Sequence, residues 1–312
     1  MCSRILNKFT LFVAVATSFC QLALSQQVPD TAYHFKIITP AYKQKSGSLI
    51  LFDEAHGNPV SLKGLYFGFN KLLAEDGYLL SSAKTEINLD MLSEAKIFVS
   101  VNAMSDPADW DAPTRSAYSD AEIAALNKWV KAGGSLFLVT DHKPCGGSVK
   151  SLAQSFGFHM INGFAIRPDR KPEIFSLKQG NLCESVITKT PGAEVDSIRI
   201  WGGAAFVPPA NAKILSMLNA GYTIYSPLKT DDMDWPIADT VPHTSGLGFV
   251  NGAFMKYGKG RIVVFADGAA FTAQLEGIKS KKRGMNNLTA PNNAQFLLNI
   301  IHWLDGILES EK

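Results

Sequence analysis

The feature that most constrains the fold is a repeated alternation between short apolar runs and helical patterns. A short apolar run bounded by polar or turn residues is typical of a strand buried in a parallel sheet, and apolar residues three or four positions apart indicate one face of a helix. This order predicts an α/β domain built on a doubly wound, mostly parallel sheet with right-handed crossovers. The expected strands are residues 48–52, 78–80, 97–101, 135–140 and 261–266, and the expected helices are residues 62–75, 119–132, 148–156 and 293–307.

Two parts of the chain depart from this alternation. Residues 162–245 are less regular and include a polar, proline-containing stretch. Because no linker-like change in composition precedes them, we expect an irregular insertion within a single domain of residues 26–312. Near the C-terminus, residues 249–254 and 261–266 flank a glycine-containing turn, which predicts a β-hairpin.

The first 25 residues have the pattern of a secretory signal. Arg4 and Lys8 precede an apolar run over residues 9–24, and small residues near Ser25 suit signal peptidase. An uncleaved membrane anchor is the alternative, but this run is shorter than the ~20 apolar residues that a span needs. We therefore expect cleavage after Ser25, export to the periplasm or the extracellular space, and no stable membrane span in the mature chain.

The charge of the mature chain bears on its partners. Without Arg4 and Lys8, the 30 basic residues fall to 28 and match the 28 acidic residues. A neutral protein exerts no overall electrostatic attraction on nucleic acid. The expected partner is therefore a small-molecule or cell-envelope substrate, and nucleic acid is not expected.

Polar residues follow four of the expected strands. In such sheets the carboxyl ends of parallel strands share an edge, and ligands bind beyond that edge. Asp and Asn also cap helices at these turns, but histidine is a poor cap, so His56 and His142 favour a functional cluster over simple capping. The polar residues in question are Asp53, Glu54, His56 and Asn58 after the first strand, Asn102 after residues 97–101, Asp141 and His142 after residues 135–140, and Asp267 after residues 261–266.

The residue types in this cluster suggest roles in metal-assisted hydrolysis. Carboxylate and imidazole ligands suit zinc, manganese or iron, and a bound divalent ion lowers the pKa of its water. The hypothesis assigns Asp53, His56 and Asp267 as metal ligands. It assigns Glu54 as a general base, with Asp141 and His142 as further catalytic residues.

Three other residues are candidates for binding substrate. Asn58 and Asn102 follow strands at the same edge of the sheet. Lys282 lies in a basic run over residues 279–283, which is either a solvated loop or a mobile flap that meets an anionic substrate.

Three segments carry a family resemblance: residues 53–57 (DEAHG), 133–142 (GGSLFLVTDH) and 258–267 (GKGRIVVFAD). Together the chain resembles the type 1 glutamine amidotransferase-like superfamily, and within it a branch of exported or membrane-associated bacterial proteins that lack the nucleophile elbow. The resemblance implies a flavodoxin-like three-layer core. Amidotransferases carry a nucleophilic cysteine on the turn directly after a strand, whereas here that turn reads Val139-Thr140-Asp141-His142. Glutamine amide transfer is therefore not expected.

Two cysteines, Cys145 and Cys183, remain after removal of the signal. In an exported protein they could form a disulfide. Alternatively, Cys145 could be a nucleophile if an imidazole lowered its pKa. The sequence leaves both alternatives open.

Two functions remain compatible with the sequence. The first is an exported hydrolase with its site at the carboxyl edge of the sheet. The second is a non-catalytic ligand-binding or assembly module, because a fold alone does not fix a function.

Overall fold

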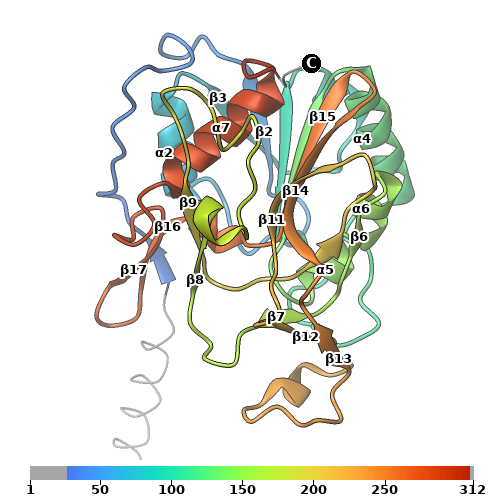
Figure 1. Ribbon diagram of the computed structural model, residues 1–312. Coiled ribbons are helices and arrows are strands. Elements are labelled where there is room, and N and C mark those ends of the chain that lie inside the picture. The colour runs from blue at the N-terminus through green and yellow to red at the C-terminus, as the bar shows by residue number, and fades with distance from the viewer. Residues whose placement is uncertain (1–26, 310–312) are drawn as a thin grey trace, which may run out of the picture.

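The computed structural model describes residues 27–309 and has the predicted α/β architecture (Figure 1). A nine-stranded mixed sheet forms its centre, and its first five strands are mutually parallel. The remaining four strands are antiparallel to their neighbours. In spatial order the parallel strands are β3 (Leu79–Ala83), β2 (Leu49–Asp53), β4 (Ile97–Val101), β5 (Ser135–Val139) and β15 (Gly260–Phe265). The antiparallel strands are β14 (Val250–Tyr257), β10 (Phe206–Val207) and β6 (His159–Met160), with β11 (Lys213–Met217) also paired to β14.

Helices cover both faces of the sheet, which gives the three layers. Side chains alternate between the faces along each strand: Ile50 and Phe52 of β2 belong to one apolar core, and Leu51 belongs to the other. The first core lies under α2 (Phe67–Glu75) and α7 (Asn293–Asp305). The second lies under α4 (Asp120–Ala132) and α6 (Lys150–Ser155), with α3 (Leu89–Ser93) and α5 (Cys145–Ser148) beside them. Figure 1 shows these two groups of helices on opposite sides of the sheet.

The helix boundaries follow local chemistry. Helix α4 begins with a capping box, in which Ser119 accepts a hydrogen bond from the Glu122 amide and the Glu122 side chain accepts one from the Ser119 amide. It ends at Gly133, whose φ of 129° favours glycine. Helix α2 begins at Phe67 instead of residue 62, because the amides of Gly64 and Tyr66 both turn back to the Ser61 carbonyl.

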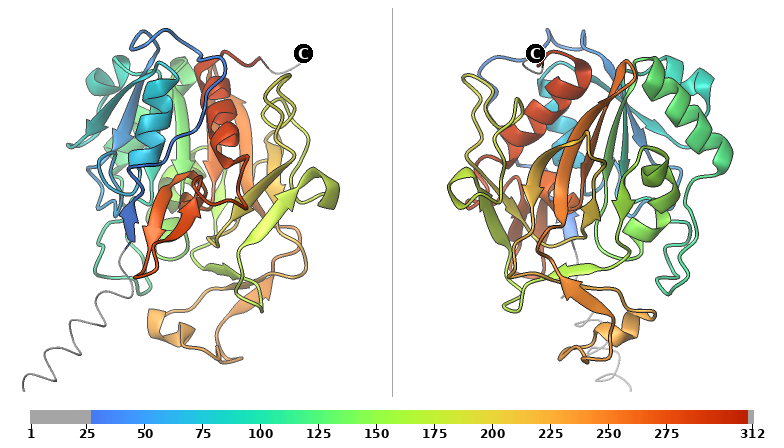
Figure 2. Two further views of the ribbon diagram at one scale, coloured as in Figure 1. Left: turned by 90° about the vertical axis from the view of Figure 1, so that its left-hand side faces the viewer. Right: turned by 45° about the vertical axis from the view of Figure 1, so that its right-hand side comes forward.

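The irregular middle of the chain is built into the same body. Its strands β10 and β11 pair with β14 of the central sheet. The rest of this segment forms two small antiparallel sheets, and only the three-stranded one lies below the carboxyl edge of the central sheet (Figures 1 and 2). One contains β7 (Phe164–Ile166), β12 (Thr223–Tyr225) and β13 (His243–Ser245), and the other contains β8 (Glu173–Ser176) and β9 (Ser197–Ile200). Short 3₁₀ turns, η1 (Leu177–Gln179) and η2 (Thr230–Met233), lie in its loops.

A projection between β12 and β13, residues 226–242, is anchored at its root by Lys143. The Lys143 side chain is fully buried, and its Nζ donates to the carbonyl oxygens of Pro227 and Leu228 at 2.9 and 2.8 Å. The Ala112 amide also donates to the Leu228 carbonyl. The projection extends away from the sheet in both views of Figure 2.

The predicted hairpin joins β14 to β15, as expected. A second hairpin was not predicted: β16 (Ala273–Glu276) and β17 (Lys281–Gly284) pair with each other, and β16 also pairs with β1 (Gln27–Pro29). The basic run is therefore partly a strand. The turn η3 (Gly268–Phe271) connects β15 to this second hairpin.

The predicted signal segment lies outside the described residues. Within residues 27–309, no helix combines the length and apolarity that crossing a membrane would require.

Candidate functional site

The carboxyl ends of three neighbouring parallel strands open into one cavity of about 410 Å³. Asn102 follows β4, Asp141 and His142 follow β5, and Asp267 follows β15, and all four residues line this cavity. The convergence of these residues agrees with the sequence expectation. The name "dyad cleft" is used below for this cavity.

Asn102 holds Asp141 in position. The Asn102 side chain donates from Nδ2 to Asp141 Oδ2 at 2.9 Å. Its backbone has a φ of 49°, a left-handed conformation that Asn tolerates better than most residues. The Asn102 amide donates to the Val139 carbonyl at 3.0 Å, which fixes this turn beside β5. Backbone strain of this kind persists where the surroundings hold it, and it is frequent at functional sites.

Asp267 is fully buried and is held by two backbone amides. Oδ1 accepts from Ala270 at 3.2 Å, which caps η3, and Oδ2 accepts from Trp201 at 2.5 Å. Burial raises the pKa of the Asp267 carboxyl well above its usual range, and the negative charge of Asp141 raises it further. The two amides oppose this shift without reversing it. Asp267 is therefore protonated under conditions in which an exposed aspartate is ionised.

Tyr66 and Gly268 complete the wall beside the two acids. The buried Tyr66 hydroxyl donates to the Gly268 carbonyl at 2.8 Å. A Cβ atom on Gly268 would lie 3.1 Å from Asp141 Oδ2 and 3.3 Å from Asn102 Nδ2. The absence of a side chain at Gly268 thus allows η3 to approach the Asp141 carboxylate closely.

His56 and Asp53 belong to a second buried cluster. His56 Nδ1 lies 2.8 Å from Asp53 Oδ1, and Nε2 lies 2.9 Å from Glu122 Oε1. The Tyr118 hydroxyl donates to Asp53 Oδ2 at 2.5 Å and its ring packs on the imidazole, while Ser100 Oγ lies 2.7 Å from the same hydroxyl. The name "His56 cluster" refers below to these five residues.

The two carboxylates of the His56 cluster set its charge state. Burial lowers the pKa of His56, but the hydrogen bonds and charges of Asp53 and Glu122 outweigh burial and raise it. Burial raises the pKa of Glu122, but hydrogen bonds from Ile87 and Ser119, together with His56, lower it overall. The imidazolium form is favoured, so His56 acts as an internal counterion.

The structure does not assemble the metal set predicted from the sequence. Asp53 and His56 satisfy each other within the His56 cluster, and both His56 nitrogens are engaged by carboxylates, whereas Asp267 lies in the dyad cleft. Among residues 27–309, no group of three or more His, Cys, Asp or Glu side chains is arranged to hold a metal ion. The ligand set Asp53, His56 and Asp267 therefore does not fit a divalent ion.

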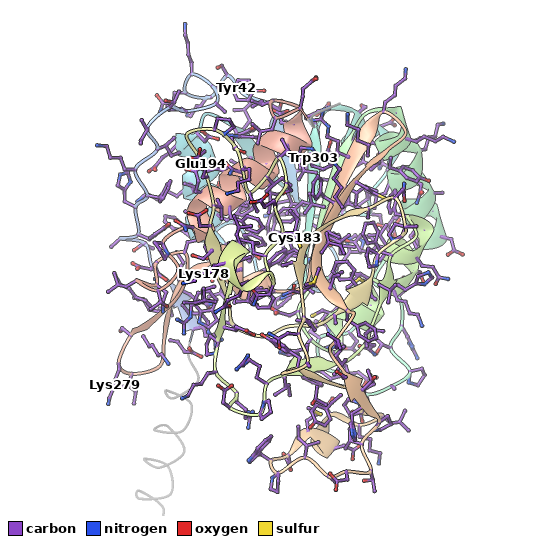
Figure 3. The ribbon with its side chains drawn as sticks, in the orientation of Figure 1. Tyr42, Lys178, Cys183, Glu194, Lys279 and Trp303 are labelled. Carbon is purple, nitrogen blue, oxygen red and sulfur yellow. The ribbon has the colours of Figure 1, made fainter. Side chains whose placement is uncertain are left out.

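Three more of the predicted site residues, Glu54, Asn58 and Lys282, do not line the dyad cleft. Glu54 Oε1 accepts the Leu62 amide at 2.9 Å. Asn58 accepts the His56 amide and donates to the Val101 carbonyl at 2.9 Å, so it fixes the turn after β2. Lys282 is exposed on β17, and its hairpin carries Lys279 outward (Figure 3). From this hairpin, Arg283 lines the cleft instead.

His142 keeps one ring nitrogen free for hydrogen bonding, whereas the Cys145 thiol is buried. His142 Nδ1 donates to the Lys143 carbonyl at 2.8 Å, which leaves Nε2 as the acceptor in the neutral ring. The ring stacks on Phe164 with centroids 4.8 Å apart. Cys145 is buried, and burial followed by the charge of Asp141 raises its pKa to about 12. Cys145 and Cys183 are both free thiols in the structure, so the disulfide alternative is not realised.

Several residues of the two clusters were not predicted. Tyr66, Trp201 and Gly203 line the dyad cleft but come from apolar or irregular sequence with no polar signal. From sequence, residues 119–122 (SDAE) indicate only a helix-capping role for Glu122. Its second role, as partner of His56 from 66 positions away, has no sequence signature.

No protein-family model matches the sequence, and no curated protein matches it. Among solved structures, the chain is similar to the mmIFT52 N-terminal domain, with 15% identity over 83% of this chain and 98% of that chain and a TM-score of 0.55. At this identity the likeness extends to the fold alone.

Two other solved structures are similar to the chain at lower TM-scores. A protein described as ThuA-like from Bacteroides uniformis has 13% identity over 87% of this chain and 94% of that chain, with a TM-score of 0.44. A protein described as a GMP synthase subunit from Thermoplasma acidophilum has 10% identity over 82% of this chain and 93% of that chain, with a TM-score of 0.42. The strand order of the chain itself, β3-β2-β4-β5-β15 with helices on both faces, gives the mixed α/β, flavodoxin-like fold.

Proposed function

We propose that the protein is a hydrolase in which Asp141 and Asp267 act as an acid–base pair on a small polar molecule bound in the dyad cleft. The observation that carries the proposal is the different environment of the two acids. Asp267 is buried with a raised pKa, and Asp141 is partly exposed and hydrogen-bonded to Asn102. Two carboxyl groups with unlike environments are a recurrent arrangement for acid and base roles in one site.

The proposed reaction needs only these two groups and water. Asp141, in its ionised form, accepts a proton from a water molecule as the water oxygen attacks the electrophilic centre of the substrate. Asp267, in its protonated form, donates its proton to the leaving-group oxygen or nitrogen as the bond to that atom breaks. After the reaction Asp141 is protonated and Asp267 is ionised. Asp141 then loses its proton to solvent and Asp267 takes one up, which restores the starting state. Asn102 orients the Asp141 carboxylate throughout.

A metal is no longer part of the proposed mechanism, because the residues that were predicted to bind it do not form a site. Cys145 is also unsuited to be the nucleophile, since its raised pKa keeps it as a thiol. Export remains a proposal that rests on the signal-like pattern of residues 1–25.

The proposal is tested by substituting each acid while preserving its shape. A panel of ester, amide and glycoside substrates is screened with the wild type, and turnover of any hit is compared with Asp141→Asn and Asp267→Asn. Each substitution should lower kcat by at least ~100-fold, the usual contribution of a positioned acid or base. Glu54→Gln is the matched control, because Glu54 was the base expected from sequence but contacts only a backbone amide. Turnover that survives both aspartate substitutions would refute the proposed pair.

A binding module without turnover is the second candidate, and one observation favours it. Both Asp267 oxygens accept backbone amides, which is also how an aspartate that only caps a turn would be held. This alternative predicts that a ligand binds in the dyad cleft and that none of the screened substrates is hydrolysed.

A further inference from the structure

A second cavity of about 300 Å³ adjoins the dyad cleft. The two cavities share four lining residues: His142, Trp201, Gly202 and Gly203. The second cavity, called the basic arm below, lies against the insertion strands β7, β8 and β9. Because the two cavities meet at these four residues, a ligand that fills one cavity can extend into the other.

Most of the charged residues that line the basic arm are positive. Arg167, Arg170 and Lys171 line it, against one carboxylate, Glu173. In the dyad cleft Arg283 lines the wall together with the Asp141 carboxylate, and the protonated Asp267 adds no charge. The combined cleft therefore has one cationic end and one end that carries both carboxyl groups, and the positive charge of the first end orients a ligand with an anionic group.

The two arginines are held in place before any ligand binds. Arg167 contacts Glu173 Oε2 at 3.1 Å and Asp169 Oδ1 at 3.3 Å, and its guanidinium carbon lies 5.8 Å from the centre of the Tyr222 ring. Arg170 lies 5.3 Å from the centre of the Trp235 ring. Arginine held by aromatic rings and carboxylates presents its remaining N–H groups in a fixed fork, which suits oxyanions. Lys171 is exposed, makes no ion pair with the residues from 27 to 309 and adds a third positive charge.

Backbone donors supply an independent indication of a ligand. Gly202 and Gly203 have φ values of 140° and 127°, which only glycine adopts readily. Over the described part of the chain, neither amide donates a hydrogen bond to protein, although the neighbouring Trp201 and Ala204 amides both do. A Cβ on Gly203 would collide with the Ala266 carbonyl, and no atom lies within 4 Å of the Cβ position of Gly202. Two consecutive free amides thus lie in the wall between the cavities.

We infer that the basic arm binds a tetrahedral oxyanion, a phosphate or sulfate group, carried by the small molecule whose reacting part lies in the dyad cleft. The anion would be bound by Arg170, Lys171 and the outer N–H groups of Arg167, with the Gly202 and Gly203 amides toward the reacting end. Binding of the anion stands by itself. Only the statement that the anion belongs to the substrate rests on the proposed function.

The binding step is tested by calorimetric titration of the protein with inorganic phosphate, sulfate and acetate at constant ionic strength. Phosphate and sulfate should bind, and acetate should bind more weakly because it offers less charge to the fork. The variant Arg170→Gln/Lys171→Gln should weaken phosphate binding by at least about tenfold, since each charge-assisted hydrogen bond is worth that much or more. The control Lys281→Gln/Lys282→Gln removes the same charge from the exposed hairpin strand β17 and should change the affinity less than twofold.

Three results would overturn the inference: no phosphate binding, equal weakening in both double variants, or acetate bound as tightly as phosphate. Melting curves of both double variants show whether each is folded, and exposed positions such as these should leave the melting temperature unchanged. Substitution of Asp141 by Asn removes a negative charge and should leave phosphate binding unchanged or tighter.

Phosphate binding and turnover, measured separately, distinguish failure of the anion site from failure of the proposed hydrolase. Phosphate binding that depends on the basic arm, without any turnover that depends on Asp141, would support the anion site and refute the hydrolase. Turnover that depends on Asp141, without phosphate binding, would refute the anion site alone. If both are correct, substrates with a phosphate or sulfate group should show a KM about tenfold higher in Arg170→Gln/Lys171→Gln, with kcat changed less.

Discussion

His56 Nε2 lies 2.9 Å from Glu122 Oε1, and this contact joins the turn after β2 to the first turn of α4. Both side chains are buried, and the opposite ring nitrogen contacts Asp53. The arrangement resembles a buried ion triad in which one cation satisfies two anions. Removal of one member of such a group is far more costly than its net contribution, because the remaining charges stay buried.

The variant His56→Ala should therefore lower the free energy of unfolding by about 3–5 kcal/mol. Denaturant titration followed by circular dichroism measures this change. The control is His34→Ala, since His34 forms an exposed contact with Glu75 at 3.5 Å and should contribute almost nothing. Equal effects of the two substitutions would contradict the role given to His56.

The stability of the protein should decline on both sides of a maximum in pH. The folded-state pKa of His56 is raised, so its contribution is fully present below the unfolded value of about 6.5 and is lost as pH rises through the folded value. The folded-state pKa of Glu122 is lowered, so its contribution is present above the unfolded value of about 4.3 and is lost as pH falls through the folded value. In His56→Gln the decline on the alkaline side should flatten. Melting temperatures measured across the pH range test both limbs.

Tyr118→Phe removes the hydroxyl that joins Asp53 and Ser100 in the His56 cluster. The ring is retained and continues to pack on His56, but Asp53 Oδ2 loses its donor and Ser100 loses its partner. The expected cost is about 1–3 kcal/mol, smaller than that of His56→Ala. Because Tyr118 and His56 both contact Asp53, the double variant His56→Ala/Tyr118→Phe should lose less stability than the sum of the losses in the two single variants.

Gly268→Ala should separate activity from stability. The added methyl group would press on the Asp141 carboxylate and the Asn102 amide without a demand on the backbone, since Gly268 is not in a left-handed conformation. If the proposed pair is correct, displacement of Asp141 should lower turnover about tenfold to a hundredfold, with little change in melting temperature. Unchanged turnover would indicate that the Asp141 position is not critical.

Cys145 should react more slowly than Cys183. Its pKa is raised to about 12 and it is buried, whereas Cys183 is only partly buried, although burial raises the pKa of Cys183 as well. Alkylation by iodoacetamide at pH 8, followed by peptide mapping, should label Cys183 first. Preferential labelling of Cys145 would revive a nucleophilic role for this thiol.

The sequence was sufficient to predict the parallel strands and the edge where their polar residues gather, because β2, β4, β5 and β15 are mostly apolar runs with a polar residue at or just after the end. It could not show which of these polar residues share a space. Asp53 ends β2 and Asp267 comes shortly after β15, yet β2 and β15 are separated by β4 and β5, so the two carboxyl groups enter different clusters. Strand order in space decides this, and order along the chain does not reveal it.

The start of helix α2 and the conformation around Lys282 were also not predictable from the local sequence pattern. Periodic apolar residues from Leu62 onward matched a helix, but the local bonds to Ser61 formed turns first. The basic run around Lys282 matched a loop, but pairing with β16 made part of it a strand. In both cases a partner outside the pattern determined the conformation.

Because the base of the projection, residues 226–242, is fixed, the projection can change in length and sequence without disturbing the core. Lys143 and the Ala112 amide fix the Leu228 backbone, and the Ser226 amide donates to the Pro242 carbonyl across the base. Whatever lies beyond that base contributes little to the central sheet. Across related chains, the tip should therefore accumulate insertions, deletions and changes of sequence fastest, apart from Trp235, which packs on Arg170. Lys143, which closes the base, should stay the same.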